Sequence, residues 1–165
     1  LFMLNLLLVT LGAAWITEGS VVMHRRTGTR NLVRADPVEE DDLEYASDQI
    51  ARVFTALAAL AEDGDAVLDR RLRLADDTRF DQELDRTGSV TSTVLVLDEG
   101  TCPDVELELE VAEVLTALDG ATTLDQAASR VARREDLSKR ETAKLKRDTR
   151  RTARDLLEQG ILELA

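Results

Sequence analysis

The sequence has very few of the residues on which most catalytic and metal sites are built. Its 165 residues include one cysteine, Cys102, and one histidine, His24. A single cysteine excludes an internal disulfide framework and a four-cysteine zinc site, and it fits a reducing, cytoplasmic location. A single histidine excludes multi-histidine metal sites. We interpret Cys102 as a passive small residue beside Pro103, and His24 as a structural or surface residue with no nucleophile at a readable spacing.

Aromatic residues and loop-forming motifs are also scarce. Aromatics make up 3% of the chain, so platforms for stacking single-stranded nucleic acid are nearly absent. The eight glycines are scattered and the two prolines are isolated, which excludes a phosphate-cradling or dinucleotide-binding loop. We therefore assign no catalytic, cofactor-binding or metal-ligating residue.

Carboxylates are plentiful by contrast. Grouped carboxylates can carry out acid–base chemistry or hold magnesium. We interpret them here as solubilising charge, and the alternating run at Glu106, Glu108 and Glu110 as one face of an extended segment. The groups are Asp76-Asp77, Asp98-Glu99, and Asp104 with the glutamates that follow it.

The chain opens on an apolar stretch from Leu1 to Ile16. This stretch is shorter than the roughly 20 residues that span a bilayer, and no basic region precedes it. We expect a buried helix or helix–strand segment with no membrane contact, the alternative being a trimmed membrane anchor or signal core. Because the pattern begins abruptly and not at a methionine, we expect a fragment of a longer protein, whose exposed apolar stretch drives self-association.

The first hundred residues combine strand and helix patterns. Residues 20–26 and 31–35 are β-prone runs around a Thr-Gly-Thr turn, which predicts a hairpin. Pro37 and the acidic residues 39–42 then precede a helix predicted over residues 43–61. Gly64 ends this helix. Its apolar side chains recur at three- and four-residue spacing and form a stripe that we expect to face a core: Leu43, Ile50, Val53, Phe54, Leu57 and Leu60.

Beyond Leu68 the apolar side chains recur at every second residue, as in a strand. Leu72 and Leu74 alternate with arginines, Phe80 and Leu84 lie among polar residues, and residues 90–97 form the strongest strand pattern. Alternation with one polar face suits antiparallel strands. We therefore expect an α+β fold with a small, mainly antiparallel sheet covered by one long helix. Turn-like residues 98–104 indicate a boundary between a region at 1–100 and a module at 101–165.

The module is predicted to be helical. A first helix over residues 110–118 stops at Asp119-Gly120, and Thr122 or Thr123 caps a second helix over residues 124–133. Its inner side would carry Ala127, Ala128 and Val131.

Ser138, followed three residues later by Glu141, matches a capping box that opens a third helix to about residue 159. Gly160 closes it before a short strand at 161–164. Three helices and a terminal strand match a winged-helix-like module. The third helix of such a module enters a nucleic-acid groove or serves only protein contact.

The third helix carries the most informative feature of the chain, a basic stripe at helical spacing. Its members are Arg140, Lys144, Arg147, Arg151 and Arg154, opposite Leu145, Thr149, Ala153, Leu156 and Leu157. Residues 130–154 hold eleven Lys/Arg and four Asp/Glu, or +7, which leaves −19 for the remainder of a chain at −12. Such asymmetry indicates a partner surface. The stripe could pair with phosphates, or it could be a solvated face balanced by the acidic remainder and diluted by Glu141 and Asp148.

Three stretches carry a family resemblance. Residues 19–36 (GSVVMHRRTGTRNLVRAD), 68–84 (LDRRLRLADDTRFDQEL) and 118–124 (LDGATTL), with the final EQGIL, resemble the C-terminal region of bacterial class I S-adenosylmethionine-dependent methyltransferases. The resemblance is to the small-domain type related to protein-glutamine N5-methyltransferases. In that family an N-terminal Rossmann-like domain carries a glycine-rich cofactor loop and an Asn-Pro-Pro-Tyr-type motif. Neither occurs here, so no catalytic residue is carried over.

The resemblance implies a non-catalytic substrate-recognition or accessory region. S-adenosylmethionine would belong to the missing N-terminal domain, which would be the partner of this region unless residues 1–16 self-associate. The basic stripe would help to hold an RNA or protein substrate. Two alternatives stay open: a stand-alone winged-helix nucleic-acid-binding or regulatory module, and a structural protein-interaction domain.

Overall fold

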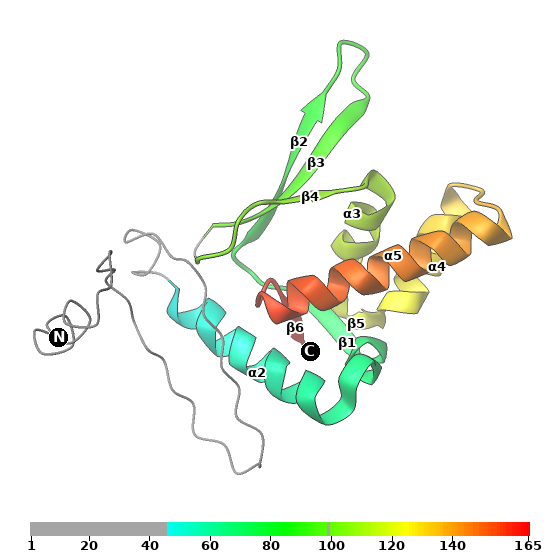
Figure 1. Cartoon of the computed structure of the whole chain (residues 1–165). Helices are drawn as coiled ribbons and strands as arrows, with labels where there is room; N and C mark the ends of the chain where they lie inside the picture. The colour runs from blue at the N-terminus through cyan, green and yellow to red at the C-terminus, as the bar shows by residue number, and fades with distance from the viewer. Residues whose placement is uncertain (1–45, 99) are drawn as a thin grey trace, which may run out of the picture.

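The computed structural model describes residues 46–98 and 100–165, which form an α+β fold (Figure 1). The predictions for residues 1–16, for the hairpin at 20–35, for His24 and for Glu99 lie outside the described residues. Within them, five helical segments accompany two antiparallel three-stranded sheets. The α+β prediction is confirmed.

The first sheet is assembled from strands far apart in the chain. Strand β1 (Arg71–Leu74) lies between β5 (Asp119–Thr123) and β6 (Leu162–Leu164), antiparallel to both. Leu72 pairs with Leu164 and Leu74 pairs with Leu162. The predicted boundary at residue 100 therefore crosses a continuous sheet, because the central strand comes from one side of it and both neighbours from the other.

The second sheet is local. Strands β2 (Thr78–Leu84), β3 (Val90–Leu97) and β4 (Val105–Leu107) pair in sequence order. The β2–β3 hairpin extends away from the helices, and β4 pairs only with residues 93–95 at its base (Figure 1). The prediction of one small sheet was wrong in this respect, since β1 belongs to the other sheet.

Helix α2 (Ser47–Asp63) is the predicted long helix, and Gly64, with φ of +58°, ends it. It continues into the 3₁₀ segment η2 (Gly64–Asp69) and packs against α5 and β6, so it does not cover the β2–β3–β4 sheet as predicted. Its fully buried residues are Gln49 and Ala56. These lie about a quarter of a turn from the centre of the predicted apolar stripe, and Ile50, Phe54 and Leu57 are only half-buried.

Three further helices form the rest of the body. They are α3 (Leu109–Thr116), α4 (Leu124–Arg134) and α5 (Lys139–Glu158). Capping boxes start the last two, one from Thr123 with Gln126 and one from Ser138 with Glu141. The predicted caps and the buried positions Ala127, Ala128 and Val131 are confirmed.

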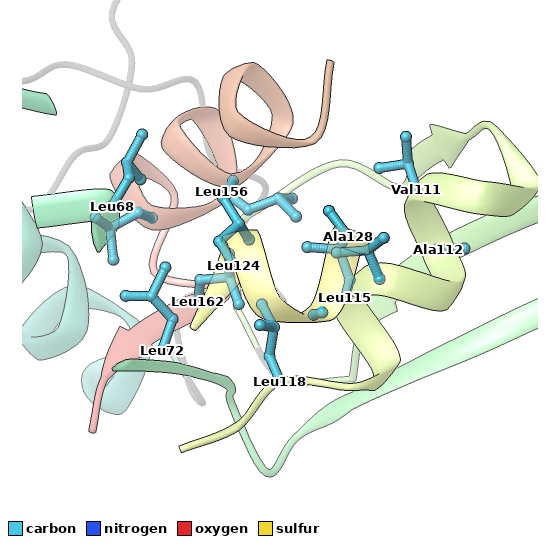
Figure 2. Close-up of a cluster of buried hydrophobic side chains, with 14 of the residues drawn as sticks. Leu68, Leu72, Val111, Ala112, Leu115, Leu118, Leu124, Ala128, Leu156 and Leu162 are labelled. Atoms are coloured by element: carbon cyan, nitrogen blue, oxygen red, sulfur yellow. The ribbon is translucent and has the colours of Figure 1, made fainter. Parts of the chain in front are cut away.

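One apolar core joins these helices to the first sheet. Figure 2 shows Leu72 and Leu162 of the sheet beside Leu124 of α4 and Leu156 of α5. Each of these four leucines is at most 1% exposed. Close packing of this kind supplies most of the stability of a small domain.

The strand order bears on the winged-helix interpretation, which stays a prediction. Residues 101–165 contain three helices, α3, α4 and α5, with β5 between the first two and β6 after the third. The strand that completes this sheet, β1, precedes all three helices in the chain. The central position of the sheet, between β5 and β6, is therefore occupied by a strand that precedes the three helices. It is not occupied by a strand of a hairpin that follows the third helix.

A polar cluster built on Gln49 joins α2 to the loop before β4 and to the end of α5. The buried Gln49 side chain accepts a hydrogen bond from the Thr101 backbone N–H at 2.7 Å and donates to the Gln159 carbonyl oxygen at 2.9 Å. It also donates to the sulfur of Cys102. Cys102 is thus half-buried in a hydrogen-bonded position beside Pro103.

A neighbouring ion pair on α2 adds to this connection. The guanidinium of Arg52 contacts Asp77 at 2.8 Å and donates to the Gly160 carbonyl oxygen at 2.7 Å. The Arg52 and Asp77 side chains are 15% and 20% exposed. This pair therefore connects α2 to the β1–β2 turn and to the turn before β6.

Candidate binding face on helix α5

Helix α5 is sharply divided into two faces. Leu145, Thr149, Ala153, Leu156 and Leu157 are its buried residues, as predicted. The predicted basic stripe, here called the basic face, lies opposite them on the wheel, and all five of its side chains are exposed: Arg140, Lys144, Arg147, Arg151 and Arg154. Burial of the apolar side of α5 against α3, α4 and β6 fixes the direction in which the basic face points.

Carboxylates of other elements border the basic face. Lys144 lies 3.1 Å from Glu108, which precedes α3, and 3.3 Å from Asp148. The hydrogen bond to Glu108 is the main reason why the pKa of Lys144 is raised, with Asp148 contributing next. Arg154 contacts Glu158 at 3.0 Å and also pairs with Asp65 of η2. The pKa of Arg154 is raised, chiefly by Glu158.

The other three arginines are less engaged. Arg147, whose side chain is 74% exposed, lies 3.6 Å from Asp148. Within residues 46–98 and 100–165, Arg140 and Arg151 form no ion pair. The basic face therefore holds two cations without a counter-charge among the described side chains.

The N-terminal half of the basic face is hollowed. A shallow depression of about 480 Å³ is lined by Ser138, Arg140, Glu141, Lys144 and Arg147. Glu141 accepts a hydrogen bond from the Ser138 backbone N–H at 2.8 Å. Its hydrogen bonds with Ser138 lower the pKa of Glu141. Since the cap already holds this carboxylate, Arg140 remains available in the lining of the depression.

The acidic groups singled out from the sequence do not converge. Asp77 pairs with Arg52 and Asp98 pairs with Arg79. Glu106 lies in β4, whereas Glu110 lies in the first turn of α3, so the prediction of one extended face through Glu110 was wrong. The chain leaves the strand at Leu107 because the apolar spacing changes there to that of a helix. In the described part of the chain, no group of three or more His, Cys, Asp or Glu side chains is placed to hold a metal ion.

A second, smaller hollow was not predicted from the sequence. It measures about 190 Å³ and lies between α2 and the α5–β6 region. Its lining includes Ala51, Arg52 and Thr55 of α2, with Leu157 and Glu163 opposite. The alanine and threonine spacing on α2 is the only sequence signal for it, and that signal is common to many packed helices.

Comparisons with known proteins place no family on this chain. No family model, curated protein or solved structure matches it. Among the helices of the described residues, none is both long and apolar enough to cross a bilayer.

Proposed function

We propose that the region is a non-catalytic recognition module that holds an anionic substrate or partner against the basic face of α5. The observation that carries this proposal is the pair Arg140 and Arg151, two exposed guanidinium groups on one helix face with no ion pair among the described side chains. An arginine fork matches a carboxylate or a phosphate in bidentate geometry. Two such forks on a rigid helix can orient a ligand as well as attract it.

The local charge supports an electrostatic mode of binding. Residues 130–154 stand at +7 in a chain at −12, so an anionic ligand is attracted locally to α5 and repelled elsewhere. Charges separated by more than about 10 Å are largely screened at 0.1 M salt. The affinity should therefore fall steeply as salt rises, and the remote acidic surface should restrict where the ligand binds.

The sequence resemblance supports a second part of the proposal, that this module belongs to a larger enzyme. On that proposal it is the C-terminal accessory region of a cytoplasmic S-adenosylmethionine-dependent methyltransferase, and the chemistry belongs to a domain encoded upstream of Leu1. The reading frame upstream should then encode a glycine-rich cofactor loop and an Asn-Pro-Pro-Tyr-type motif. A start codon only a few residues upstream would refute this assignment, while leaving the binding proposal for α5 intact.

A charge-reversal experiment tests the binding proposal. We expect the full chain to bind at least one of two labelled polyanions, polyglutamate or an RNA of about 20 nucleotides, at low salt. Reversing Arg140 and Arg151 to glutamate should weaken that binding by about tenfold or more. Arg86→Glu is the matched control, because Arg86 is exposed at the hairpin tip and far from α5 in the fold. Equal affinities for the three proteins would contradict the proposal.

A further inference from the structure

The spacing of the basic face is informative about its partner. Its five cations follow one another at intervals of four, three, four and three residues from Arg140 to Arg154. This alternation averages 3.5 residues and keeps side chains in line along a neighbouring helix, as in the seam of a coiled coil. At 1.5 Å per residue the line extends for roughly 20 Å. A second helix lying alongside could match it over its whole length.

The flanks of the basic face disfavour nucleic acid. A helix in the major groove lies in a channel about 12 Å wide, so its flanks approach the phosphates. One flank of α5 carries Asp148 and Asp155, and near the other lie Asp65 and Asp69, which pair with Arg154 and Arg150. These carboxylates would face the phosphates on both sides. A partner with separate charges along a single line avoids them.

The basic face already accepts carboxylates from outside its own helix. Glu108 reaches Lys144 from the start of α3, and Asp65 reaches Arg154 from η2. The side chains of both glutamate and aspartate are more than 60% exposed. Exposed pairs of this kind contribute little, so a carboxylate of a partner can join or replace them. Within residues 46–98 and 100–165, no carboxylate of another element pairs with Arg147 or Arg151 in the middle of the line.

We propose, on the basis of the proposed function, that the partner held by α5 is an acidic helix of another protein. Its carboxylates recur at the same alternating spacing of four and three residues and lie along the line from Arg140 to Arg154. The depression beside Ser138 and Lys144 receives one end of this helix. Charge complementarity and the spacing of the cations together select such a partner over a phosphate backbone.

Binding of designed peptides tests this inference with the full chain. The first peptide is a labelled helix former with glutamates at the alternating spacing. The second has the same composition and net charge, but its glutamates are distributed around the helix. Fluorescence anisotropy at low salt should give an affinity about tenfold higher for the first peptide. A tenfold difference in affinity requires only a modest difference in binding free energy. An RNA and a DNA duplex are titrated in parallel.

Variants connect the binding to α5. Arg140→Glu with Arg151→Glu should remove the preference for the first peptide, and Arg140→Gln with Arg151→Gln should reduce it. Arg86→Glu should leave it unchanged. Circular dichroism of each variant checks that the fold is intact. We expect it to be, because these arginines are exposed.

The outcomes separate this inference from the proposed function. Tighter binding of a nucleic acid than of the first peptide, with dependence on Arg140 and Arg151, would overturn the acidic helix and retain α5 as the binding face. Equal affinities for the two peptides would also overturn it. Binding that is insensitive to both arginines for every probe would overturn the inference and the proposed function together.

Discussion

The two sheets of the molecule are built in opposite ways. The β5–β1–β6 sheet joins strands from three distant parts of the chain, and Leu72 and Leu162 within it are completely buried. The β2–β3–β4 sheet joins neighbours in sequence, and the distal half of its hairpin is exposed, with Leu84 at 61%. The first sheet therefore depends on the core, whereas the distal part of the second depends on its own hydrogen-bond ladder and turn.

This difference shows where stability and recognition are located. The apolar face of α5 belongs to the body that contains the first sheet, so its basic face is held on a rigid support. The hairpin has no equivalent support beyond its base, where Thr93 and Leu95 are buried. Changes in the first sheet should therefore affect the whole fold, and changes in the hairpin tip should stay local.

The largest expected effect comes from the central strand. Leu72→Ala removes a fully buried side chain from β1 and should lower the free energy of unfolding by about 2–5 kcal/mol. Leu84→Ala, on the exposed part of the hairpin, should change it by less than about 0.5 kcal/mol. Urea unfolding followed by circular dichroism measures both. Similar losses for the two variants would mean that the distal part of the hairpin contributes to global stability as much as the central strand does.

Local elements of this fold could be predicted because their signals are local. The capping boxes at Thr123 and Ser138 require only a side chain three residues away, and both are present in the structure. The partners of β1 could not be predicted, since a four-residue strand with two leucines does not specify its neighbours. The buried face of α2 was misplaced because Gln49 satisfies its polar atoms inside the protein, against the usual preference of glutamine for the surface.

The candidate site shows the same limit. The helical wheel of residues 139–158 was sufficient to predict that the basic face is exposed, because the opposite face is strongly apolar. The counter-charges were not predictable from the sequence, as Glu108 lies 36 residues from Lys144 and Asp65 lies 89 residues from Arg154. Which cations remain available follows only from the tertiary fold.

An intermediate loss of stability is expected at Gly160, where the turn after α5 packs against α2. Gly160 has φ of +73°, and a Cβ there would lie 2.9 Å from the carbonyl oxygen of Gln49. Gly88, in the hairpin turn, has φ of +84° with no atom within 4 Å of a Cβ. Gly160→Ala should therefore cost about 2–4 kcal/mol, combining backbone strain with overpacking, and Gly88→Ala about 1 kcal/mol. Equal costs in urea unfolding would show that the contact with α2 is unimportant.

The smallest effect should be confined to the hairpin turn. The Asp85 carboxylate accepts hydrogen bonds from the Thr87 hydroxyl at 2.6 Å, the Thr87 amide at 2.7 Å and the Ser89 amide at 2.9 Å. These bonds, the Thr87 hydroxyl foremost, lower the pKa of Asp85. Because the folded pKa lies below that of the unfolded chain, the carboxylate stabilises the turn above about pH 4 and ceases to do so as the pH falls through the folded value.

The amide chemical shifts of Thr87 and Ser89 should titrate with a midpoint below that of an ordinary aspartate, and Asp85→Ala should abolish the titration without changing urea unfolding of the body. A midpoint at the ordinary value, or a loss of global stability in Asp85→Ala, would contradict a turn that is stabilised locally and independently of the core.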